Sequence, residues 1–374
     1  MKYYIISGEA SGDLHAANLV KQLKKKDTQA QFRGWGGDLM QAQGVDVVKH
    51  YRDLAFMGFI EVVMNLRTIL KNIKLCKTDI DAFKPDVLIL VDYPGFNLRI
   101  AEWAQENNYK VYYYISPQIW AWKENRIKKI KKSVDEMFVI LPFEEEFYAK
   151  HNYKVNFVGH PLLDAIDDFK EKAPDFNTFC TRHGLSQLPI IALLPGSRKQ
   201  EISTMLPIML AAADQFKNYQ FVIAGAPSQE KNVYQPFLSR PNVHLISGKT
   251  YNLLQQSTAA LVTSGTATLE TALFQVPEVV CYKGSWISYW IARQLVKIDY
   301  ISLVNLIMDR EVVKELIQSE LNIQNITSEL HAILPEGEKR KQQLEDYKAL
   351  KMKLGGVGAS KTTASMMLKT LKEA

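Results

Sequence analysis

Leu193-Leu194-Pro195-Gly196-Ser197-Arg198 is the stretch of this sequence that decides its fold. An apolar run that begins at Ile190 stops at the Pro-Gly turn, and a helical pattern of apolar residues extends from Ser197 to Leu206. The stretch therefore predicts a buried strand that passes through a tight turn into a helix.

The start of that helix has the properties of an anion-binding site. The first backbone N–H groups of a helix have no partner within it, and the positive end of the helix dipole lies there. Arg198 adds a guanidinium, whose planar set of donors matches the oxygens of a phosphate. A diphosphate is the ligand that this arrangement favours. Taken alone, however, the stretch favours an ordinary strand-turn-helix junction in which Arg198 forms a surface ion pair, because short motifs often match by chance.

The length and composition are typical of a folded protein with two domains. The chain has 374 residues, of which 47% are hydrophobic and 23% charged. This length suits two domains of roughly 180 residues each. The formal net charge is +6, a small excess that matters only where the basic residues are clustered.

The cysteines and the hydropathy pattern predict a reducing compartment and no membrane span. Cys76, Cys180 and Cys281 are odd in number and lack the spacing of metal ligands, which is typical of a cytoplasmic protein without disulfides. The first residues, MKYYIISGEASGD, contain no secretory apolar region, and no run of 18 apolar residues occurs. Any contact with a membrane is therefore expected to be peripheral.

Two segments are candidates for a membrane contact. The basic run from Lys123 to Lys132 either attracts phosphates or an anionic bilayer, or forms a solvated helix face; its lysines include Lys128, Lys129, Lys131 and Lys132. The segment from Met57 to Ile73 is expected to be helical, and its apolar face either packs in the core or contacts acyl chains. That face consists of Phe59, Val63, Leu66, Leu70 and Ile73.

Apolar strands alternate with helical patterns along the chain, and each strand ends in small or polar residues. This alternation predicts an α/β protein with parallel sheets, in which ligands bind at the carboxyl ends of the strands. We expect one Rossmann-like domain over residues 1–175 and a second over residues 176–354. The sequence leaves open whether the last helix, within 355–374, packs back on the first domain. The loop 7–13 lacks the GxGxxG spacing, which disfavours a nicotinamide enzyme.

Asp92 is the candidate general base. It follows the apolar run Val87 to Val91, which is expected to be a strand buried on both faces, and it precedes a Pro-Gly turn. A carboxylate in that position is partly desolvated, and desolvation raises its proton affinity. An aspartate that merely caps a turn is an equally good interpretation of this stretch alone.

The segment Thr263 to Glu270 is a second candidate phosphate site. Ser264, Gly265 and Thr266 are small or hydroxyl-bearing residues at the predicted start of a helix. Glu270, one turn further on, can accept hydrogen bonds from a ribose diol. Together these residues indicate a nucleotide site, although a capped helix with an exposed glutamate would have the same pattern.

Asn305 lies further along, in an irregular apolar segment. A buried unpaired amide is costly, so the side chain of Asn305 is expected to hydrogen-bond to backbone or to a ligand. A helix is expected next, from Arg310 to Ser319.

Four motifs, taken together, resemble the lipid-A-disaccharide synthase family of GT-B glycosyltransferases. The resemblance extends from about Tyr3 to Val313. It implies two Rossmann-like domains whose parallel sheets face a central cleft. The motifs are Ser7-Gly8-Glu9-Ala10-Ser11-Gly12-Asp13, Ser116-Pro117-Gln118-Ile119-Trp120-Ala121-Trp122, Leu194-Pro195-Gly196-Ser197-Arg198 and Ser264-Gly265-Thr266-Ala267-Thr268-Leu269-Glu270.

The resemblance implies an inverting transfer of 2,3-diacylglucosamine from its UDP conjugate to 2,3-diacylglucosamine 1-phosphate. The products would be a β-1,6-linked disaccharide 1-phosphate, a lipid A precursor, and UDP. Asp92 matches the family's proposed base and Arg198 its arginine near the diphosphate. The other matching residues are expected to bind substrate, and they are Glu9, Asn97, Gln118, Ser264, Gly265, Thr266, Glu270 and Asn305. The sequence departs from the family at Gly95, where many members have Asp, and at Val304, where they have Pro.

No metal or other cofactor is expected. The one DxD triplet, Asp79-Ile80-Asp81, lies on a predicted helix, where residues two apart face different directions. The acylated substrates imply peripheral binding to the inner leaflet of the cytoplasmic membrane. The resemblance also implies a homodimer, and no nucleic-acid partner is expected.

Two other interpretations remain from the residues alone. A UDP-N-acetylglucosamine 2-epimerase, or another GT-B enzyme acting on a soluble UDP-sugar, would share the nucleotide site without needing the apolar face. A two-lobed ligand-binding protein would need export, and the first residues do not predict it.

Overall fold

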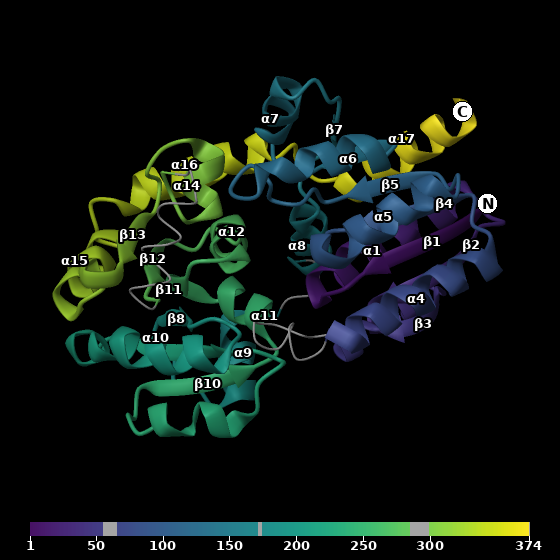
Figure 1. The fold of residues 1–374 in the computed structure, drawn as a ribbon. Coiled ribbons are helices and arrows are strands. Elements are labelled where there is room, and N and C mark those ends of the chain that lie inside the picture. Colours follow the sequence, from purple (N-terminus) through teal and green to yellow (C-terminus); the bar gives the residue numbers. More distant parts are fainter. Residues whose placement is uncertain (55–65, 171–173, 285–298, 374) are drawn as a thin grey trace. The chain divides into compact units, whose positions relative to one another are not determined.

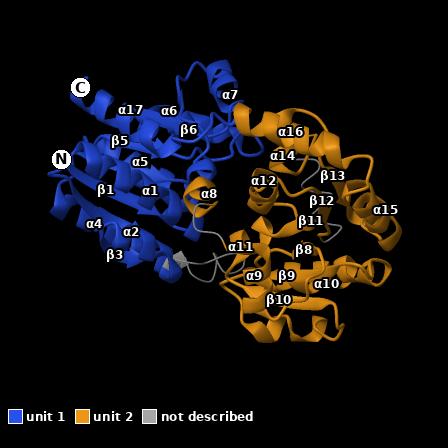
Figure 2. Ribbon diagram, turned by 180° about the vertical axis from the view of Figure 1, so that it is seen from behind, with its two compact units in different colours: residues 1–164, 354–374 blue, residues 165–353 orange. Residues whose placement is uncertain are grey.

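A computed structural model describes the chain except for residues 55–65, 171–173, 285–298 and 374. It divides into two compact units, one formed by residues 1–164 with 354–374 and the other by residues 165–353 (Figure 2). The first boundary between the units therefore falls after Asp164, whereas the sequence predicts a boundary after residue 175. Each unit is a parallel sheet covered by helices on both faces (Figure 1).

The first unit contains a sheet of seven parallel strands in the order β3-β2-β1-β4-β5-β6-β7. The strands are β1 Lys2–Ser7, β2 Gln31–Gly36, β3 Asp46–His50, β4 Val87–Val91, β5 Val111–Tyr114, β6 Glu136–Val139 and β7 Asn156–Phe157. The helices are α1 Ala10–Lys26, α2 Asp38–Ala42, α4 Leu66–Phe83, α5 Pro94–Glu106, α6 Ile127–Ser133, α7 Glu144–Lys150 and α17 Ala359–Glu373, with the 3-10 turns η1 Tyr51–Leu54 and η2 Glu124–Arg126; α8 Leu162–Lys170 crosses the boundary.

Alternate residues of the central strands enter two different cores, as the period of a strand requires. Tyr4 and Ile6 of β1 pack with residues of α4, α5 and α6. Tyr3 and Ile5 pack on the opposite face with residues of α1 and α17. Burial on both faces explains why these strands appear in the sequence as nearly continuous apolar runs.

The C-terminal helix α17 belongs to the first unit, where it packs against α1. The Asp164 carboxylate accepts hydrogen bonds from the backbone N–H groups of Gly358 and Ser360, at 2.6 and 2.9 Å, and so caps the start of this helix. Near its end, Thr370 hydrogen-bonds to the Tyr112 hydroxyl of β5 at 2.8 Å. The last helix therefore completes one face of the first sheet.

The second unit contains six parallel strands in the order β10-β9-β8-β11-β12-β13. The strands are β8 Ile190–Leu194, β9 Gln220–Gly225, β10 Val243–Ser247, β11 Ser257–Thr263, β12 Glu278–Tyr282 and β13 Lys314–Ile317. The helices are α9 Phe176–His183, α10 Lys199–Ala211, α11 Thr250–Gln255, α12 Thr266–Leu273, α14 Leu303–Met308, α15 Ile323–Ile333 and α16 Arg340–Lys353, with the 3-10 turns η3 Ala213–Gln215, η4 Lys231–Val233, η5 Gln235–Phe237 and η6 Gln318–Glu320.

The order of strands reverses once in each sheet. In the first unit β1 pairs with β2 on one side and with β4 on the other, and in the second unit β8 lies between β9 and β11. Connections on the two sides of such a point leave in opposite directions, which opens a crevice at the carboxyl ends of the two strands. The register pairs Ser7 with Val91 and Leu194 with Val262, so the loops that follow these residues meet at the two crevices.

The predicted helix from Arg310 to Ser319 is wrong. Lys314–Ile317 forms the edge strand β13, which pairs with β12, and only a 3-10 turn follows it. Val313 and Leu316 are buried in the core, and Glu315 is buried as well. Polar residues within this short edge strand interrupt the alternation of apolar and polar residues that indicates a strand, so the sequence predicts a helix instead. In the described part of the chain, no helix is long and apolar enough to cross a membrane.

Glu278, the first residue of β12, is a buried acid of the second unit. Its side chain is fully buried, and among the described residues neither carboxylate oxygen has a hydrogen-bond partner. Burial raises the pKa of Glu278 well above its ordinary value. The folded state therefore holds a proton that the unfolded chain releases, and the group's contribution to stability is lost as the pH rises.

We predict that Glu278→Gln stabilises the protein at pH 8 by about 1–3 kcal/mol, because the amide removes the need to keep an acid protonated. The gain should shrink toward pH 4.5, where the unfolded chain also binds the proton. Thermal unfolding midpoints at both pH values measure this, with the exposed Glu336→Gln as the control. An equal gain at the two pH values would contradict the explanation.

Candidate active site

Asp92 lies at the crevice of the first unit, directly after β4. Asp92 and Tyr93 both have left-handed backbones, with φ of 46° and 49°, an unusual conformation for two successive residues other than glycine. The Tyr93 ring lies against Gly8 of the neighbouring loop, where any side chain would clash with the ring. The turn therefore directs Asp92 away from the strand, and Gly8 is needed for the close approach.

The Asp92 carboxyl has a perturbed proton affinity. Burial, and then the nearby Glu9 carboxylate, raise the pKa of Asp92 to about 6, and a backbone hydrogen bond from Tyr93 opposes them. Glu9 is the exposed residue before α1, at the carboxyl end of β1. The first crevice thus brings together two of the predicted site residues, and one of them has a proton affinity suited to general-base catalysis near neutral pH.

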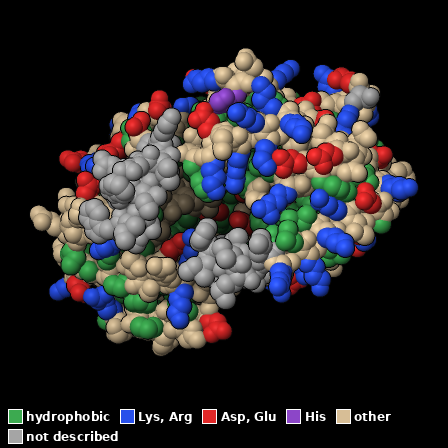
Figure 3. All heavy atoms as spheres, in the orientation of Figure 1, with side chains coloured by type: hydrophobic (Ala, Val, Ile, Leu, Met, Phe, Trp, Pro, Cys, Tyr) green, Lys and Arg blue, Asp and Glu red, His purple; other side chains and the backbone are tan. Residues whose placement is uncertain are grey.

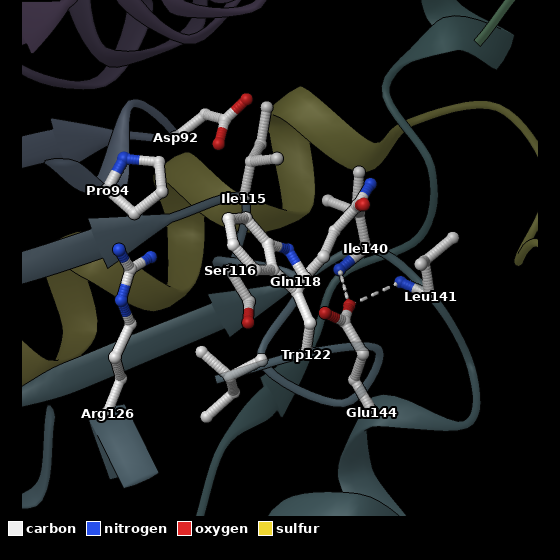
Figure 4. Close-up of a pocket in the computed structure, with 11 residues that line it drawn as sticks. Asp92, Pro94, Ile115, Ser116, Gln118, Trp122, Arg126, Ile140, Leu141 and Glu144 are labelled. Atoms are coloured by element: carbon white, nitrogen blue, oxygen red, sulfur yellow. Dashed lines mark hydrogen bonds between the residues drawn. The ribbon is translucent and has the colours of Figure 1, made fainter. Parts of the chain in front are cut away.

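A cavity of about 250 Å³ adjoins Asp92 (Figure 4). Gln118, from the Ser-Pro-Gln-Ile-Trp-Ala-Trp motif, lines it, as expected of a substrate-binding residue. Two charged residues of the lining, Arg126 and Glu144, were not among the site residues predicted from the sequence. The cavity lies wholly within the first unit and combines acidic, basic and aromatic side chains.

Glu144 forms one wall of this cavity and is fully buried. Its carboxylate accepts hydrogen bonds from the backbone N–H groups of Ile140 and Leu141, at 3.2 and 2.9 Å, as Figure 4 shows. Burial raises the pKa of Glu144 to about 7, and the two backbone hydrogen bonds oppose this rise. The cavity therefore contains two acids, Asp92 and Glu144, whose pKa values are both shifted toward neutrality.

Asn97 is fully buried in the first turn of α5. Its side-chain amide donates to the carbonyl oxygens of Asp92 and Val91, at 2.7 and 3.3 Å, and the Tyr113 hydroxyl also donates to the Asp92 carbonyl at 2.5 Å. These contacts hold the strained turn in place. The structure thus places Asn97 as a support for the backbone of Asp92.

In the second unit, the predicted anion site lies at the crevice between β8 and β11, but its donors already have a partner. The backbone N–H groups of Ser197 and Arg198 donate to the Glu201 carboxylate, at 3.1 and 3.2 Å, in a capping box. Arg198 also forms an ion pair with Glu201 at 3.5 Å. The turn therefore does bind an anion in this structure, and that anion is a side chain of α10.

The second candidate phosphate site, at the start of α12, adjoins the same crevice. Gly265 and Thr266 are exposed, whereas the Ser264 hydroxyl donates to the Ile301 carbonyl at 2.9 Å. Glu270 accepts a hydrogen bond from the Tyr251 hydroxyl at 3.0 Å, and burial raises its pKa. Tyr251, which the sequence did not single out, thus fixes the carboxylate expected near the ribose.

Asn305 is fully buried, and its amide binds only the protein among the described residues. Its oxygen accepts from the N–H groups of Val312 and Val313, at 2.7 and 2.9 Å, and its nitrogen donates to Val313 and Glu315, both at 2.9 Å. Glu315 in turn accepts from the N–H groups of residues 301 and 302. The structure thus gives the Asn305 amide both backbone partners and the Glu315 carboxylate.

The residues of the predicted membrane surface have different environments. Phe59 and Val63 lie outside the described residues, and of Leu66 the structure gives only its place at the start of α4. Ile73 is buried in the core, whereas Leu70 is 55% exposed.

The four lysines of α6 are exposed, and Figure 3 shows basic side chains gathered over this helix. Lys129 forms an ion pair with Glu102 at 3.0 Å, and Lys131 donates to the His151 carbonyl at 2.8 Å. Lys128 and Lys132 lie four residues apart and so share one face of the helix.

The DxD triplet does not converge on one point. Asp79 pairs with Arg33 at 2.7 Å, and Asp81 accepts from the Tyr109 hydroxyl at 2.8 Å. Within the described ranges, no cluster of His, Cys, Asp or Glu side chains has the geometry of a metal site.

The fold and the two crevices define a class of protein. Two Rossmann-like units, each with polar residues at the point where strand order reverses, form the GT-B architecture of enzymes that act on nucleotide-sugars. A UDP-GlcNAc 2-epimerase from Neisseria meningitidis, solved with UDP-GlcNAc, has a TM-score of 0.62 to this chain and 16% sequence identity, with complete coverage of both chains. This similarity shows the fold alone.

The family follows from sequence. A family model described as lipid-A-disaccharide synthetase matches residues 3–369. The lipid-A-disaccharide synthases of Syntrophus aciditrophicus and Myxococcus xanthus are 41% and 38% identical to this chain, over 99% and 98% of it and 97% of each relative. The chain belongs to the lipid-A-disaccharide synthase family of glycosyltransferases.

We predict that Glu9→Gln moves the acidic limb of the kcat/KM profile to lower pH. The wild-type limb should lie near pH 6, the pKa of Asp92, and loss of the neighbouring negative charge makes Asp92 easier to ionise. Initial rates at subsaturating substrate between pH 4.5 and 8 measure the limb.

The exposed Glu106→Gln serves as the control for a changed net charge. A limb that stays in place in Glu9→Gln, whatever the maximal rate, would show that Asp92 does not set it.

Proposed function

We propose that this chain transfers 2,3-diacylglucosamine from UDP-2,3-diacylglucosamine to the 6-hydroxyl of 2,3-diacylglucosamine 1-phosphate, with Asp92 as the general base. The observation that carries this proposal is the position and acidity of Asp92. A strained turn holds its carboxyl at the crevice of the first unit, and burial and Glu9 raise its pKa. At pH 7 such a group is mostly ionised, yet more basic than an ordinary aspartate.

The base acts as the acceptor oxygen attacks the anomeric carbon of the donor. Asp92 takes the proton of the 6-hydroxyl, the new C–O bond forms with inversion, and the bond from the anomeric carbon to the diphosphate breaks as its electrons pass to UDP. Asn97 positions Asp92 by holding its carbonyl group. Gln118 and Glu9, which lie at or near the same cavity, are proposed to orient the acceptor.

The donor's nucleotide is proposed to bind at the crevice of the second unit. Backbone N–H groups at the start of α10 and α12, with Arg198, supply fixed donors for the diphosphate, and no metal is required for that stabilisation. Glu270, fixed by Tyr251, accepts from the ribose. The remaining contacts are proposed for Ser264, Gly265 and Thr266, and Asn305 supports the segment to which Ser264 bonds.

The reaction itself is tested by incubating the two acylated monosaccharides with the protein and measuring the labelled lipid disaccharide and UDP. No product above a protein-free control would reject the function. An epimerase would instead convert UDP-N-acetylglucosamine without releasing UDP.

We predict that Asp92→Asn lowers turnover by about 100-fold or more, because the amide cannot accept the hydroxyl proton. Its affinity for UDP, measured by calorimetry, should match that of the wild type. The exposed Asp53→Asn is the matched control. Turnover near the wild-type value in Asp92→Asn would assign the base to another group.

We further propose that the protein binds peripherally to the inner face of the cytoplasmic membrane and works as a homodimer. The exposed lysines of α6, and Leu70 with the exposed Arg67 and Lys71 beside it, offer cationic and apolar side chains to an anionic bilayer. The proposed acyl chains of both substrates favour such a location.

We predict that replacing Lys128, Lys129, Lys131 and Lys132 with Gln weakens co-sedimentation with vesicles that contain anionic lipid. Each lysine near the surface contributes about 1 kcal/mol, so the loss should be large at low salt and small at high salt. The control replaces Lys25 and Lys26, two exposed lysines of α1, which covers the opposite face of the sheet. Co-sedimentation equal to wild type at every salt concentration would remove α6 from the membrane surface.

A further inference from the structure

The proposed mechanism does not use two cations: Arg126, which lines the cavity next to Asp92, and Lys123, which packs on the ring of the lining residue Trp122. Arg126 lines the cavity, and Lys123 lies just before the turn η2. Figure 4 shows the guanidinium of Arg126 directed toward Pro94, another residue of the lining. Among the described residues, no carboxylate pairs with either cation, although the neighbouring Lys129 and His151 both have acidic partners. The N–H groups of Arg126 and Lys123 are therefore available to an anion.

Trp122 preorganises both cations. Its ring is half exposed, and the ring centroid lies 4.1 Å from Lys123 Nζ and 5.8 Å from the central guanidinium carbon of Arg126. An aromatic face attracts a cation without neutralising its charge. Trp122 thus restricts the two side chains beside the cavity and leaves their charge for a ligand.

The backbone around the cavity is strained in a way that is unusual for this chain. The structure describes ten residues other than glycine with positive φ, and four of them are Asp92, Tyr93, Ile115 and Lys123. Ile115 is β-branched, which makes its φ of 65° especially unfavourable. Strain of this kind persists where it serves a binding or catalytic site, so its concentration here supports a ligand in the cavity.

The charges around the cavity determine which ligand fits. Asp92 and Glu144 are acids on its wall, and a bare anion would be repelled by them. Arg126 offers a planar fork of N–H donors, and such a fork binds phosphate oxygens in pairs. A molecule with a phosphate at one end and a hydroxyl at the other would satisfy the guanidinium and Asp92 together.

We propose that Arg126, assisted by Lys123, binds the phosphate of the acceptor, and that this contact selects a phosphorylated sugar. The inference rests on the proposed function, since the acceptor there carries a phosphate at C1 and reacts at the hydroxyl of C6, which is bonded to C5 on the other side of the ring oxygen. Arg126 is a specificity residue in this scheme. It fixes the sugar so that the 6-hydroxyl faces Asp92.

The phosphate of a membrane phospholipid has the same chemistry, so the test must separate the two sources. Rates are measured in detergent micelles without phospholipid, using 2,3-diacylglucosamine 1-phosphate and the same diacylglucosamine without its phosphate. Both acceptors carry the same acyl chains, so their ratio of kcat/KM reports the phosphate contact alone. Binding to anionic vesicles is measured in parallel.

Wild type should prefer the phosphorylated acceptor, and Arg126→Gln should lose about 10- to 100-fold in kcat/KM with that acceptor. Its rate with the phosphate-free acceptor and its KM for the UDP-sugar should change little. Arg126→Lys keeps the charge but loses the planar set of N–H donors. Its kcat/KM with the phosphorylated acceptor should therefore lie between the values of the wild type and of Arg126→Gln. The exposed Arg99→Gln, on α5 and outside the cavity lining, is the matched control.

An Arg126→Gln variant that keeps the wild-type preference for phosphate overturns the subsite. The same preference together with weaker vesicle binding would assign the cations to phospholipid headgroups instead. If Arg126→Gln does not fold, as judged by its thermal midpoint, Lys123→Gln and Arg126→Lys provide the same comparison. Absence of transfer by the wild type would reject the proposed function itself, whereas transfer with an unchanged preference rejects only the subsite.

Discussion

The reversal of strand order in each parallel sheet is the constraint on which the rest of this structure depends. Chain connections that leave β1 and β4, or β8 and β11, cannot cover the gap between those strands. The loops after Ser7, Val91, Leu194 and Val262 therefore meet in pairs. Asp92, Arg198 and Glu270 each lie in one of these loops or in the helix that follows it, whereas Gln118, Arg126 and Glu144 follow the neighbouring strands β5 and β6.

Burial has opposite consequences for the acids of this chain, depending on what surrounds them. Asp92 and Glu144 border a cavity, and their raised pKa values are of use in handling a proton or a polar ligand. Glu278 lines a separate cavity in the second unit, but neither of its carboxylate oxygens has a hydrogen-bond partner among the described residues, and its burial reduces stability. A raised pKa therefore does not by itself identify a catalytic group.

The sequence predicts the central strands well, because strands buried on both faces appear as uninterrupted apolar runs. The runs Val87 to Val91 and Ile190 to Leu194 coincide with β4 and β8. The edge strand β13 was missed because Lys314 and Glu315 break its apolar pattern, and the inward direction of Glu315 depends on its contacts with residues 301 and 302.

The candidate site could be predicted only where its residues lie next to a strand end in the sequence. Asp92, Arg198 and Glu270 satisfy that condition. Arg126 belongs to the basic run from Lys123 to Lys132 and Glu144 to a different segment, and no local pattern indicates that tertiary packing brings these two side chains to one cavity. The left-handed turn at Asp92 could not be predicted either, because the residue types Asp and Tyr do not by themselves indicate a positive φ.

The capping box at the start of α10 has a consequence for nucleotide exchange. Because Glu201 already occupies the N–H groups of Ser197 and Arg198, a diphosphate that enters this turn must displace a carboxylate. The net affinity of the proposed diphosphate site would then be the difference between the affinities of the turn for the two anions. Because the Glu201 carboxylate is part of the chain, the N–H groups of the turn keep a partner when no diphosphate is bound.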